Sequence, residues 1–280
     1  MKVITTLLCI CYCCLVSGQS SEAEFGAVYD FTHQKDSTNT ASKITTPFVL
    51  LFNTLGQSVY YSRPQHTIDS IMNQTNSGAK ALTADEQQLI SGSVKKIGSS
   101  EVIYFAGNGS QFVKLVKWIT GDVAVEGDVP NFAWKLTDTS EQILNLKCFK
   151  ARGFWKGRNY VAWFAPSIPT KAGPWKANGL PGLITKMSDT KDQISWELVR
   201  LYQCSKSTNL SVPLKTPKMT EGQFREMRDF AIKDMNGYLQ SATGGMVSTP
   251  FGQAKVSVSI NSLGANTSAS LLPKNPIELP

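Results

Sequence analysis

The chain has 280 residues, of which 41% are hydrophobic, enough for one large domain or two small ones with a sizeable core. Lysine and arginine outnumber aspartate and glutamate by 28 to 21, which gives a formal net charge of +7. This excess is modest and spread along the chain, so the composition argues against a dedicated nucleic-acid-binding protein, and no apolar run beyond the N-terminal segment is long enough to span a membrane.

Residues 1–18 have the composition of a secretory signal peptide, with a positive start, an apolar centre and a small-residue cleavage site. Lys2 supplies the charge and Val16-Ser17-Gly18 the cleavage site, so we expect the mature chain to begin at Gln19. A lipoprotein signal is the alternative, but large residues precede the cysteines of this segment, where lipidation signals have small ones. The sequence therefore predicts an exported protein of the periplasm, the outer-membrane surface or the extracellular space.

The mature part is dominated by short β-rich runs bounded by turn residues. Their alternation of apolar and polar side chains predicts strands at 25–31, 47–55, 58–62, 101–106, 111–119, 131–138, 142–151, 160–164, 183–188, 194–204 and 255–260. Residues 152–158 are expected to turn the chain between two of these strands. Residues 63–81 are polar and are interpreted as a surface segment in which His66 lies in a loop.

Two segments have the pattern of amphipathic helices that begin at a capping box. Thr83-Ala-Asp-Glu86 precedes apolar residues up to Ile97, and Thr220-Glu-Gly-Gln223 precedes an apolar stripe up to Tyr238. We therefore predict a single domain over residues 19–280, mainly β (a β-rich α+β fold). It is expected to be a curved antiparallel sheet, a sandwich or a half-barrel, with two short-to-medium helices on one side or end.

The stretch 167–184 reads SIPTKAGPWKANGLPGLI and cannot be a helix or a central strand. Four prolines and three glycines lie between Pro166 and Gly182, which excludes both structures. Its apolar side chains, Trp175 and Leu180 among them, stabilise the fold only if they pack, so we predict an ordered loop across the sheet or over a cavity. Pro181 and Gly182 fit the two central positions of a type II turn.

Within this stretch, Gly179-Leu-Pro-Gly-Leu-Ile184 resembles the signature of the GLPGLI family, secreted proteins of Bacteroidetes-type bacteria. The flanking sequence is similar to that family in several further motifs: Cys148 with Lys150-Ala151, Arg152-Gly-Phe-Trp-Lys-Gly-Arg-Asn-Tyr160, Ala162-Trp163-Phe164, Ile168-Pro169, Gly173-Pro-Trp-Lys176 and Asn275-Pro-Ile-Glu-Leu279. The resemblance covers residues 140–190 closely and the rest of the mature chain loosely. It implies an exported envelope protein, of a kind often associated with outer-membrane receptor systems. Because the family has no assigned reaction, it implies no catalytic residues.

No motif in the chain predicts a catalytic centre, a metal site or a cofactor. The only histidines, His33 and His66, are not at metal-ligand spacing with another ligand. His66 and nearby Asp69 are the only visible acid–base pair, although an ordinary surface histidine is the simpler interpretation. Glu197, next to Trp196, is the first residue to test for a hydrolase that uses paired carboxylates, and here too a plain outward-facing glutamate is simpler.

Aromatic residues between 155 and 196 are the candidate binding residues, namely Trp155, Tyr160, Trp163, Trp175 and Trp196. Tryptophans offer large apolar faces with one hydrogen-bond donor each, so such a cluster can line a pocket for an apolar or sugar ligand, or can be ordinary core. Basic residues are interleaved with aromatic ones in the same region. In an exported chain, a hairpin with a solvated basic tip explains that pattern better than nucleic-acid binding does.

Two cysteines remain in the mature chain, Cys148 and Cys204. In an oxidising compartment they could form a disulfide that stabilises the fold by about 4 kcal/mol, or they could be two separate buried thiols, and the sequence favours neither. The turn at Asp189 to Asp192 could bind calcium weakly, but a polar turn is the simpler interpretation.

Together these features predict an exported, non-catalytic binding or accessory protein that uses a Trp-rich face and the 167–184 loop. Its expected partner is an apolar or lipid-like ligand or an outer-membrane protein, with no nucleic acid, no cofactor and no membrane-spanning segment. A secreted hydrolase with an unlocated carboxylate pair and a purely structural scaffold are the alternatives. An aromatic cavity without facing carboxylates would favour binding, two carboxyls across a cleft would favour hydrolysis, and a filled core would favour a scaffold.

Overall fold

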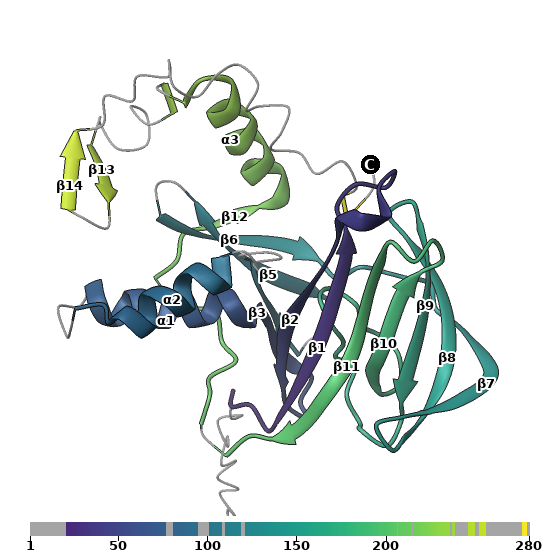
Figure 1. Ribbon diagram of the computed structural model, residues 1–280. Coiled ribbons are helices and arrows are strands. Elements are labelled where there is room, and N and C mark those ends of the chain that lie inside the picture. Colours follow the sequence, from purple (N-terminus) through teal and green to yellow (C-terminus); the bar gives the residue numbers. More distant parts are fainter. Residues whose placement is uncertain are drawn as a thin grey trace, which may run out of the picture.

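The computed structural model describes residues 21–76, 81–94, 101–107, 110–118, 121–205, 207–213, 215–235, 237–238, 246–249, 252–255 and 276–278. The predicted signal peptide lies outside these residues, as does nearly all of the strand predicted at 255–260. Within them, twelve strands form one curved open sheet in the order β12-β6-β5-β4-β3-β2-β1-β11-β10-β9-β8-β7 (Figure 1).

The strands of this sheet are β1 (Phe25–Gln34), β2 (Lys43–Phe52), β3 (Gln57–Ser62), β4 (Val102–Ala106), β5 (Gln111–Trp118), β6 (Gly121–Asp128), β7 (Lys135–Ile143), β8 (Leu146–Trp155), β9 (Arg158–Ala165), β10 (Leu183–Asp189), β11 (Ile194–Gln203) and β12 (Lys218–Thr220). The helices are α1 (Arg63–Asn76), α2 (Ala84–Val94) and α3 (Glu221–Lys233), with one 3₁₀ turn, η1 (Thr40–Ser42). A separate hairpin consists of β13 (Met246–Thr249) and β14 (Gly252–Lys255).

The sheet is built from two antiparallel meanders that meet in its centre. β1 to β6 run outward to one edge, β7 to β11 run back from the other edge, and β11 pairs with β1. Every pairing is antiparallel except β12 with β6, which is parallel. The prediction of a mainly β fold with a curved antiparallel sheet is therefore confirmed.

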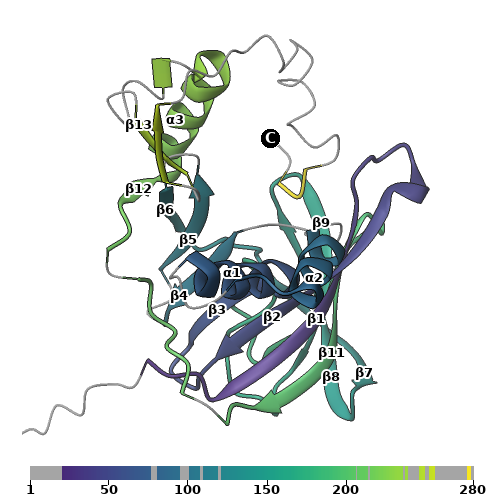
Figure 2. The same ribbon diagram turned by 60° about the vertical axis from the view of Figure 1, so that its left-hand side comes forward.

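Side chains alternate between an inner and an outer face of the sheet. The inner face, which includes Tyr29, Phe48 and Tyr60, carries the largest hydrophobic cluster of the described residues. The outer face, with Val49, Leu51 and Val59, carries a smaller cluster. Helix α1 contacts β2 and β3, and Figure 2 shows α1 and α2 lying across the outer side of these strands.

Residues 166–182, here named the central loop, pack against the inner face. Trp175 is 7% exposed and Leu180 is 1% exposed, which confirms that the loop is ordered and seated on the sheet. The loop folds back on itself through a bridge between Ala172 and Asn178, and Ile184 N–H donates to the carbonyl of Ala172.

The predicted type II turn at the end of this loop is wrong. Gly182 N–H donates to the carbonyl of Leu180 at 2.9 Å, which closes a three-residue γ-type turn around Pro181. Gly182 has φ 149°, and a Cβ placed there would lie 2.3 Å from the carbonyl oxygen of Ala165. Glycine is needed at this position because of the close backbone approach as well as the positive φ.

Some predicted boundaries were also wrong. Residues 63–81, interpreted as a loop, contain helix α1, whose Ile71 is buried, so the protein has three described α-helices instead of two. Strand β6 was missed, and residues 131–134 precede β7 without forming a strand.

Two tight turns account for the boundary errors around β8. The predicted strand 142–151 is interrupted by a two-residue turn at Leu144 and Asn145, both with positive φ, as type I′ hairpins require. The turn predicted at 152–158 is only Lys156 and Gly157, again with positive φ at both positions. None of the described helices is both long and apolar enough to cross a membrane.

Candidate functional site

A continuous row of aromatic rings crosses the inner face of the sheet. Neighbouring centroids in this aromatic row are 4.8 to 5.6 Å apart, and the rings alternate between stacked, tilted and edge-to-face contacts. In spatial order its members are Tyr60, Phe48, Phe31, Trp196, Trp175, Trp155 and Phe132, with Trp134 and Tyr160 against Phe132. The row joins β1, β2, β3, β8, β9 and β11 through Trp175 of the central loop.

One part of this row is not filled. A cavity of about 40 Å³, here named the aromatic slot, lies between the rings of β1, β2, β3, β11 and the central loop, and Glu101, Ile103 and Ile277 close it. Trp196 Nε1 donates to the Tyr60 hydroxyl at 3.1 Å. Burial holds the pKa of Tyr60 well above its ordinary value, so this hydroxyl stays neutral. The slot is therefore an aromatic space with the neutral Tyr60 hydroxyl inside it and the Glu101 carboxylate in its lining.

Four of the five candidate binding residues, Trp155, Tyr160, Trp175 and Trp196, lie in the aromatic row. The fifth, Trp163, lies apart from this row on the outer face of β9, where the Lys150 ammonium is 5.6 Å from its ring centroid. Strand alternation explains the difference, since Ala162 and Phe164 point inward and the residue between them points outward.

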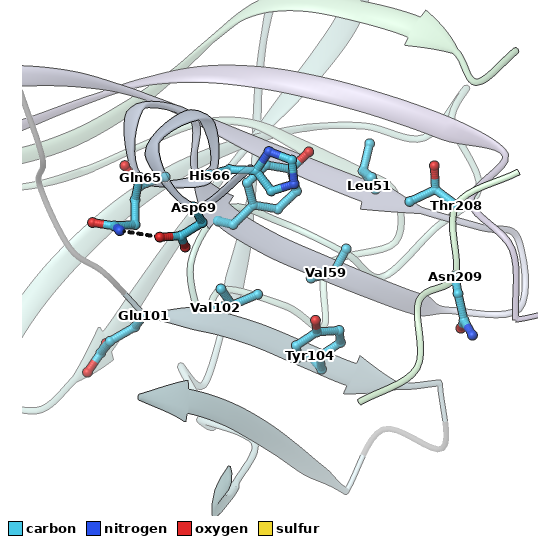
Figure 3. A pocket seen from close by; sticks show the side chains of 12 residues that line it. Leu51, Val59, Gln65, His66, Asp69, Glu101, Val102, Tyr104, Thr208 and Asn209 are labelled. Carbon is cyan, nitrogen blue, oxygen red and sulfur yellow. Dashed lines mark hydrogen bonds between the residues drawn. The ribbon is translucent and has the colours of Figure 1, made fainter. Parts of the chain in front are cut away.

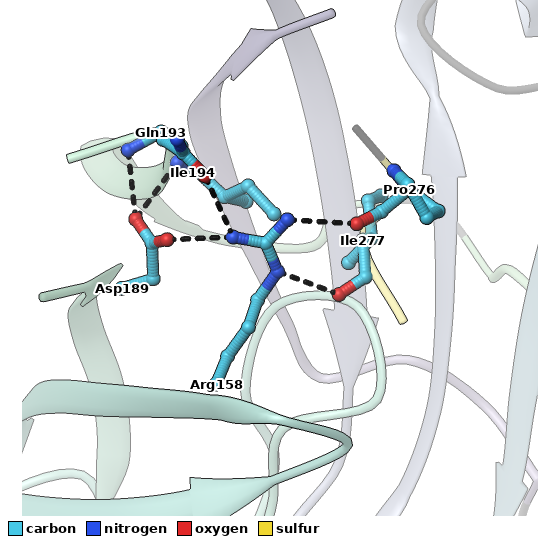
Figure 4. Close-up of polar contacts among 6 residues, drawn as sticks. All are labelled: Arg158, Asp189, Gln193, Ile194, Pro276 and Ile277. Carbon is cyan, nitrogen blue, oxygen red and sulfur yellow. Dashed lines mark hydrogen bonds and ion pairs between the residues drawn. The ribbon is translucent and has the colours of Figure 1, made fainter. Parts of the chain in front are cut away.

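Beside the slot, the side chain of Arg158 holds the C-terminal segment (Figure 4). Its Nε donates to the carbonyl of Ile277 at 3.2 Å, and its Nη2 donates to the carbonyl of Pro276 at 2.8 Å. Its Nη1 donates to Asp189 Oδ2 at 2.8 Å and to Gln193 Oε1 at 3.1 Å. Arg158 is 4% exposed and Asp189 is also 4% exposed, so this is a buried ion pair with its hydrogen bonds satisfied.

Lys176 of the central loop holds the next residue of that segment. Its ammonium is 2.6 Å from Glu278 Oε1 and 3.5 Å from Oε1 of Glu221, in the first turn of α3. The same ammonium lies 4.5 Å from the ring centroid of Phe112, which adds a cation–π contact. Lys176 is 3% exposed, so the central loop places a buried positive charge against Glu278, the residue after Ile277.

Neither Arg158 nor Lys176 was selected from the sequence as a site residue. Both lie inside motifs noted for the family resemblance, and so does the segment Pro276 to Glu278 that they bind. In the sequence, the feature that could have indicated these two site residues is a charged residue within a stretch of aromatic and small residues. Composition alone could not show that these three motifs meet.

In the turn at Asp189 to Asp192, basic side chains of the protein pair with both carboxylates. Asp189 pairs with Arg158 and also accepts the backbone N–H groups of Gln193 and Ile194. Asp192 pairs with Lys43 at 2.8 Å. Among the residues that the structure describes, no cluster of histidine, cysteine and carboxylate side chains could hold a metal ion.

A second pocket, of about 200 Å³, lies on the outer face between α1, strands β3 and β4 and the segment around Thr208 (Figure 3). Its floor is apolar and its rim is polar; we name it the outer pocket, and its lining includes Leu51, Val59, Val102, His66, Asp69 and Tyr104. Burial is the main cause that raises the pKa of Tyr61, another lining residue, to about 12.

His66 and Asp69 both line the outer pocket, but their side chains contact other residues and not each other. The Asp69 carboxylate accepts a hydrogen bond from Gln65 Nε2 at 2.7 Å and pairs with Lys117, whereas the His66 ring packs on Tyr61. Glu197 is exposed on the outer face opposite Asp30 of β1, away from the described pockets. These positions give neither a histidine–carboxylate dyad nor two carboxyls across a cleft.

Cys148 and Cys204 are free thiols at separate places in this structure. Cys148 is buried on β8 with its Sγ 3.3 Å from Thr185 Oγ1, and Cys204 packs in the outer hydrophobic cluster. Burial raises the pKa of both thiols above the ordinary value. Of the two readings of the sequence, separate thiols is the one observed.

No protein-family model matches the chain, and a search of curated proteins found no match. Among solved structures, PNGF-II in two crystal forms is similar with a TM-score of 0.51 and 10% identity, covering 73% of this chain and 32% of that chain. The chain thus spans about a third of PNGF-II, and this likeness shows the fold alone. A structure assigned as an outer membrane lipoprotein-sorting protein domain from Vibrio parahaemolyticus reaches a TM-score of 0.28 at 6% identity, over 65% of this chain and 86% of that chain, which is too low for inference.

Proposed function

We propose that the protein is an exported, non-catalytic binding protein of the GLPGLI type, which holds an apolar group in the aromatic slot. The observation that carries this proposal is the slot itself: an unfilled space between stacked aromatic rings, with the GLPGLI-containing loop as one wall. The signal-peptide pattern of residues 1–18 supports export to the cell envelope. The motifs around the central loop support the family assignment.

The chemistry of the slot suits binding better than catalysis. Its rings provide large apolar faces, and within it Trp196 donates to the neutral hydroxyl of Tyr60. The one carboxylate in its lining, Glu101, pairs with Lys114 at 3.1 Å. A group that enters this space would gain apolar contact and meet no unpaired charge, which favours an aliphatic or aromatic moiety.

The slot becomes large enough for a ligand only when Ile277 leaves it, because its present volume is about 40 Å³. Engineered apolar cavities of about 150 Å³ bind benzene. In the mature chain, Ile277→Ala should enlarge the slot and make indole or benzene binding measurable by titration calorimetry. Ile277→Trp should fill the slot and abolish that binding. Both substitutions lie on a half-exposed residue, so the sheet keeps its packing.

Leu136→Ala, at a strand residue that is 60% exposed, is the control for a loss of apolar surface elsewhere. It should bind indole no better than the wild-type chain. Equal binding by wild type, Ile277→Ala and Ile277→Trp would show that the slot is not a binding site. Mass spectrometry of molecules that co-purify with the protein from its native envelope would then identify the natural ligand class.

A further inference from the structure

We infer that the aromatic slot, Arg158 and Lys176 form one binding site for an extended peptide of another protein, in which an aliphatic residue precedes a carboxylate. The chain's own residues 276–278, here named the tail, occupy this site until such a peptide replaces them. This inference rests on the proposed function and deepens it, because it names the class of ligand that the slot accepts.

Consecutive residues of the tail meet different groups of the site. The carbonyls of Pro276 and Ile277 accept hydrogen bonds from Arg158, the Ile277 side chain closes the aromatic slot, and the Glu278 carboxylate pairs with Lys176. Peptide-binding domains work in the same way, since main-chain hydrogen bonds supply affinity and side-chain pockets supply specificity.

The groups that hold the tail are fixed by partners other than the tail. Asp189 and Gln193 orient the Arg158 guanidinium, and backbone N–H groups orient Asp189 in turn. Lys176 is fixed over Phe112 and next to Glu221. A site whose groups are held by their own surroundings is preorganised, so little ordering cost arises when a segment binds.

The site and its occupant differ in burial. With the tail in place, Arg158 and Lys176 are 4% and 3% exposed, whereas the tail residues are half-buried and lie at the surface above β9 (Figure 2). Pro276 fixes its own φ, so the bound segment has lost less conformational freedom than an ordinary chain would lose. A surface segment on a buried, preformed receptor can leave without breaking the core.

The polar groups distinguish a peptide from a lipid or a small apolar molecule. The Nε and Nη2 of Arg158 donate to two successive carbonyls, at 3.2 and 2.8 Å. Successive amide carbonyls at that spacing are a property of polypeptide. Lys176 then selects for a carboxylate on the next residue, at 2.6 Å.

The test uses a weakened-tail variant of the full mature chain, which carries both Ile277→Ala and Glu278→Gln. Its ligand is a synthetic peptide with the unchanged sequence of residues 274–280, Lys-Asn-Pro-Ile-Glu-Leu-Pro. Fluorescence anisotropy of the labelled peptide should show binding to this variant at least about tenfold tighter than to the wild-type chain, where the tail competes. Peptides that carry Ile277→Ala or Glu278→Gln should each bind about tenfold more weakly, because each loses one of the recognised groups.

A cycle with Lys176→Met in the weakened-tail background isolates the carboxylate contact. Against this receptor the unchanged peptide and the Glu278→Gln peptide should bind equally, whereas the Ile277→Ala peptide should still bind more weakly. This pattern would not arise if Lys176 only stabilised the fold. The apparent affinities of the unchanged and the Glu278→Gln peptides would then both fall in proportion to the folded fraction of the receptor, and the difference between them would remain.

Absence of peptide binding, or equal binding of a scrambled peptide, would overturn the inference. If indole still binds to Ile277→Ala in that case, the slot remains an apolar site and only the peptide assignment fails. If neither binds, the proposed function fails as well. If the wild-type chain is a dimer that the peptide dissociates, the ligand is the tail of a second copy of this chain. That result would overturn the inference that the ligand belongs to another protein.

Discussion

The inner and outer faces of the same sheet accommodate polar groups in different ways. On the inner face Arg158, Lys176 and Asp189 are almost fully buried, and each is bonded to groups from distant parts of the chain. On the outer face the pocket lies between α1, which crosses β2 and β3, and strand β4, and its polar residues form the rim. Most of the outer pocket therefore comes from residues between Leu51 and Tyr104, with Thr208 and Asn209 added, whereas the inner site needs contacts between β9, the central loop and the tail.

This difference predicts opposite responses to change. A buried charge that loses its partner still bears the full cost of desolvation, so substitutions at the inner face should lower the free energy of unfolding strongly. Charges at the rim of the sheet remain hydrated when a partner is removed, so substitutions there should lower it only slightly. The lining differs too, because Ile277 of the tail closes the inner slot, whereas no tail residue lines the outer pocket.

The largest effect is expected where the central loop enters the inner face. Pro181→Ala together with Gly182→Val should destabilise the domain by about 5 kcal/mol, because the valine Cβ would lie within 2.3 Å of the Ala165 carbonyl oxygen. Chemical denaturation followed by tryptophan fluorescence measures this change. Gly92→Ala in α2, where an added Cβ meets open space, is the control and should stabilise the chain by about 0.5 to 1 kcal/mol. A double variant that unfolds like the wild type would contradict the organising role of the loop.

The buried ion pair should give the next largest effect. Asp189→Ala leaves the Arg158 guanidinium buried without its carboxylate and removes the acceptor of two backbone N–H groups, so it should cost about 3 to 5 kcal/mol. Asp189→Ala combined with Arg158→Met should recover part of this loss, because no unpaired charge remains. Urea unfolding of the two variants and the wild type tests this order of stability. If the double variant were the least stable, the unpaired charge would not be the cause.

Much of the sheet could be predicted from sequence because its signals are local. Alternating apolar residues identified the regions of β1, β4, β5, β9, β10 and β11, and capping boxes identified α2 and α3. The capping box at Thr220 is present, with Gln223 N–H donating to its hydroxyl. Helix α1 was missed because it has few apolar residues: Pro64 and Ile71 are buried, and most of its other side chains are polar.

The candidate site was less predictable because its essential contacts are not local. The composition pointed to Trp155, Trp175 and Trp196, since tryptophan clusters are visible without knowledge of the fold. The bond from Arg158 to Pro276 joins residues 118 positions apart, and no spacing rule relates such positions. Predicting that Trp163 points outward would have required the strand register. The sequence of β9 does not reveal that register, because the strand is apolar on both faces.

Titration of the tyrosine hydroxyls at alkaline pH should distinguish the outer face of the sheet from the inner face. Burial raises the pKa of Tyr61, on the outer face, from 10.0 to about 12, whereas the inner Tyr60 is raised well above its ordinary value. A raised pKa means that the folded state retains the proton, so stability present below pH 10 is lost as the pH rises toward about 12. Tyr61→Phe should therefore reduce the loss of unfolding free energy across that pH range.

Unfolding free energies at several alkaline pH values, together with tyrosinate absorbance, would measure this effect. In the folded protein, the Tyr61→Phe variant should lack the absorbance step near pH 12 that the wild type shows. If the step persists, another tyrosine carries it and the outer pocket is less buried than the structure indicates.

The smallest effect should come from an ion pair with the same kinds of charge at the surface. Lys43 is 2.8 Å from Asp192, the same separation as Arg158 and Asp189, but the side chains of Lys43 and Asp192 are 35% and 81% exposed. Lys43→Ala should therefore cost less than about 1 kcal/mol in urea unfolding, and added salt should reduce the difference further. A loss as large as that of Asp189→Ala would mean that burial does not decide the strength of these pairs. A small loss of stability for Lys43→Ala would mean that an ion pair contributes strongly only where it is buried. Arg158 and Lys176, the charged residues that hold the tail, are buried in this way.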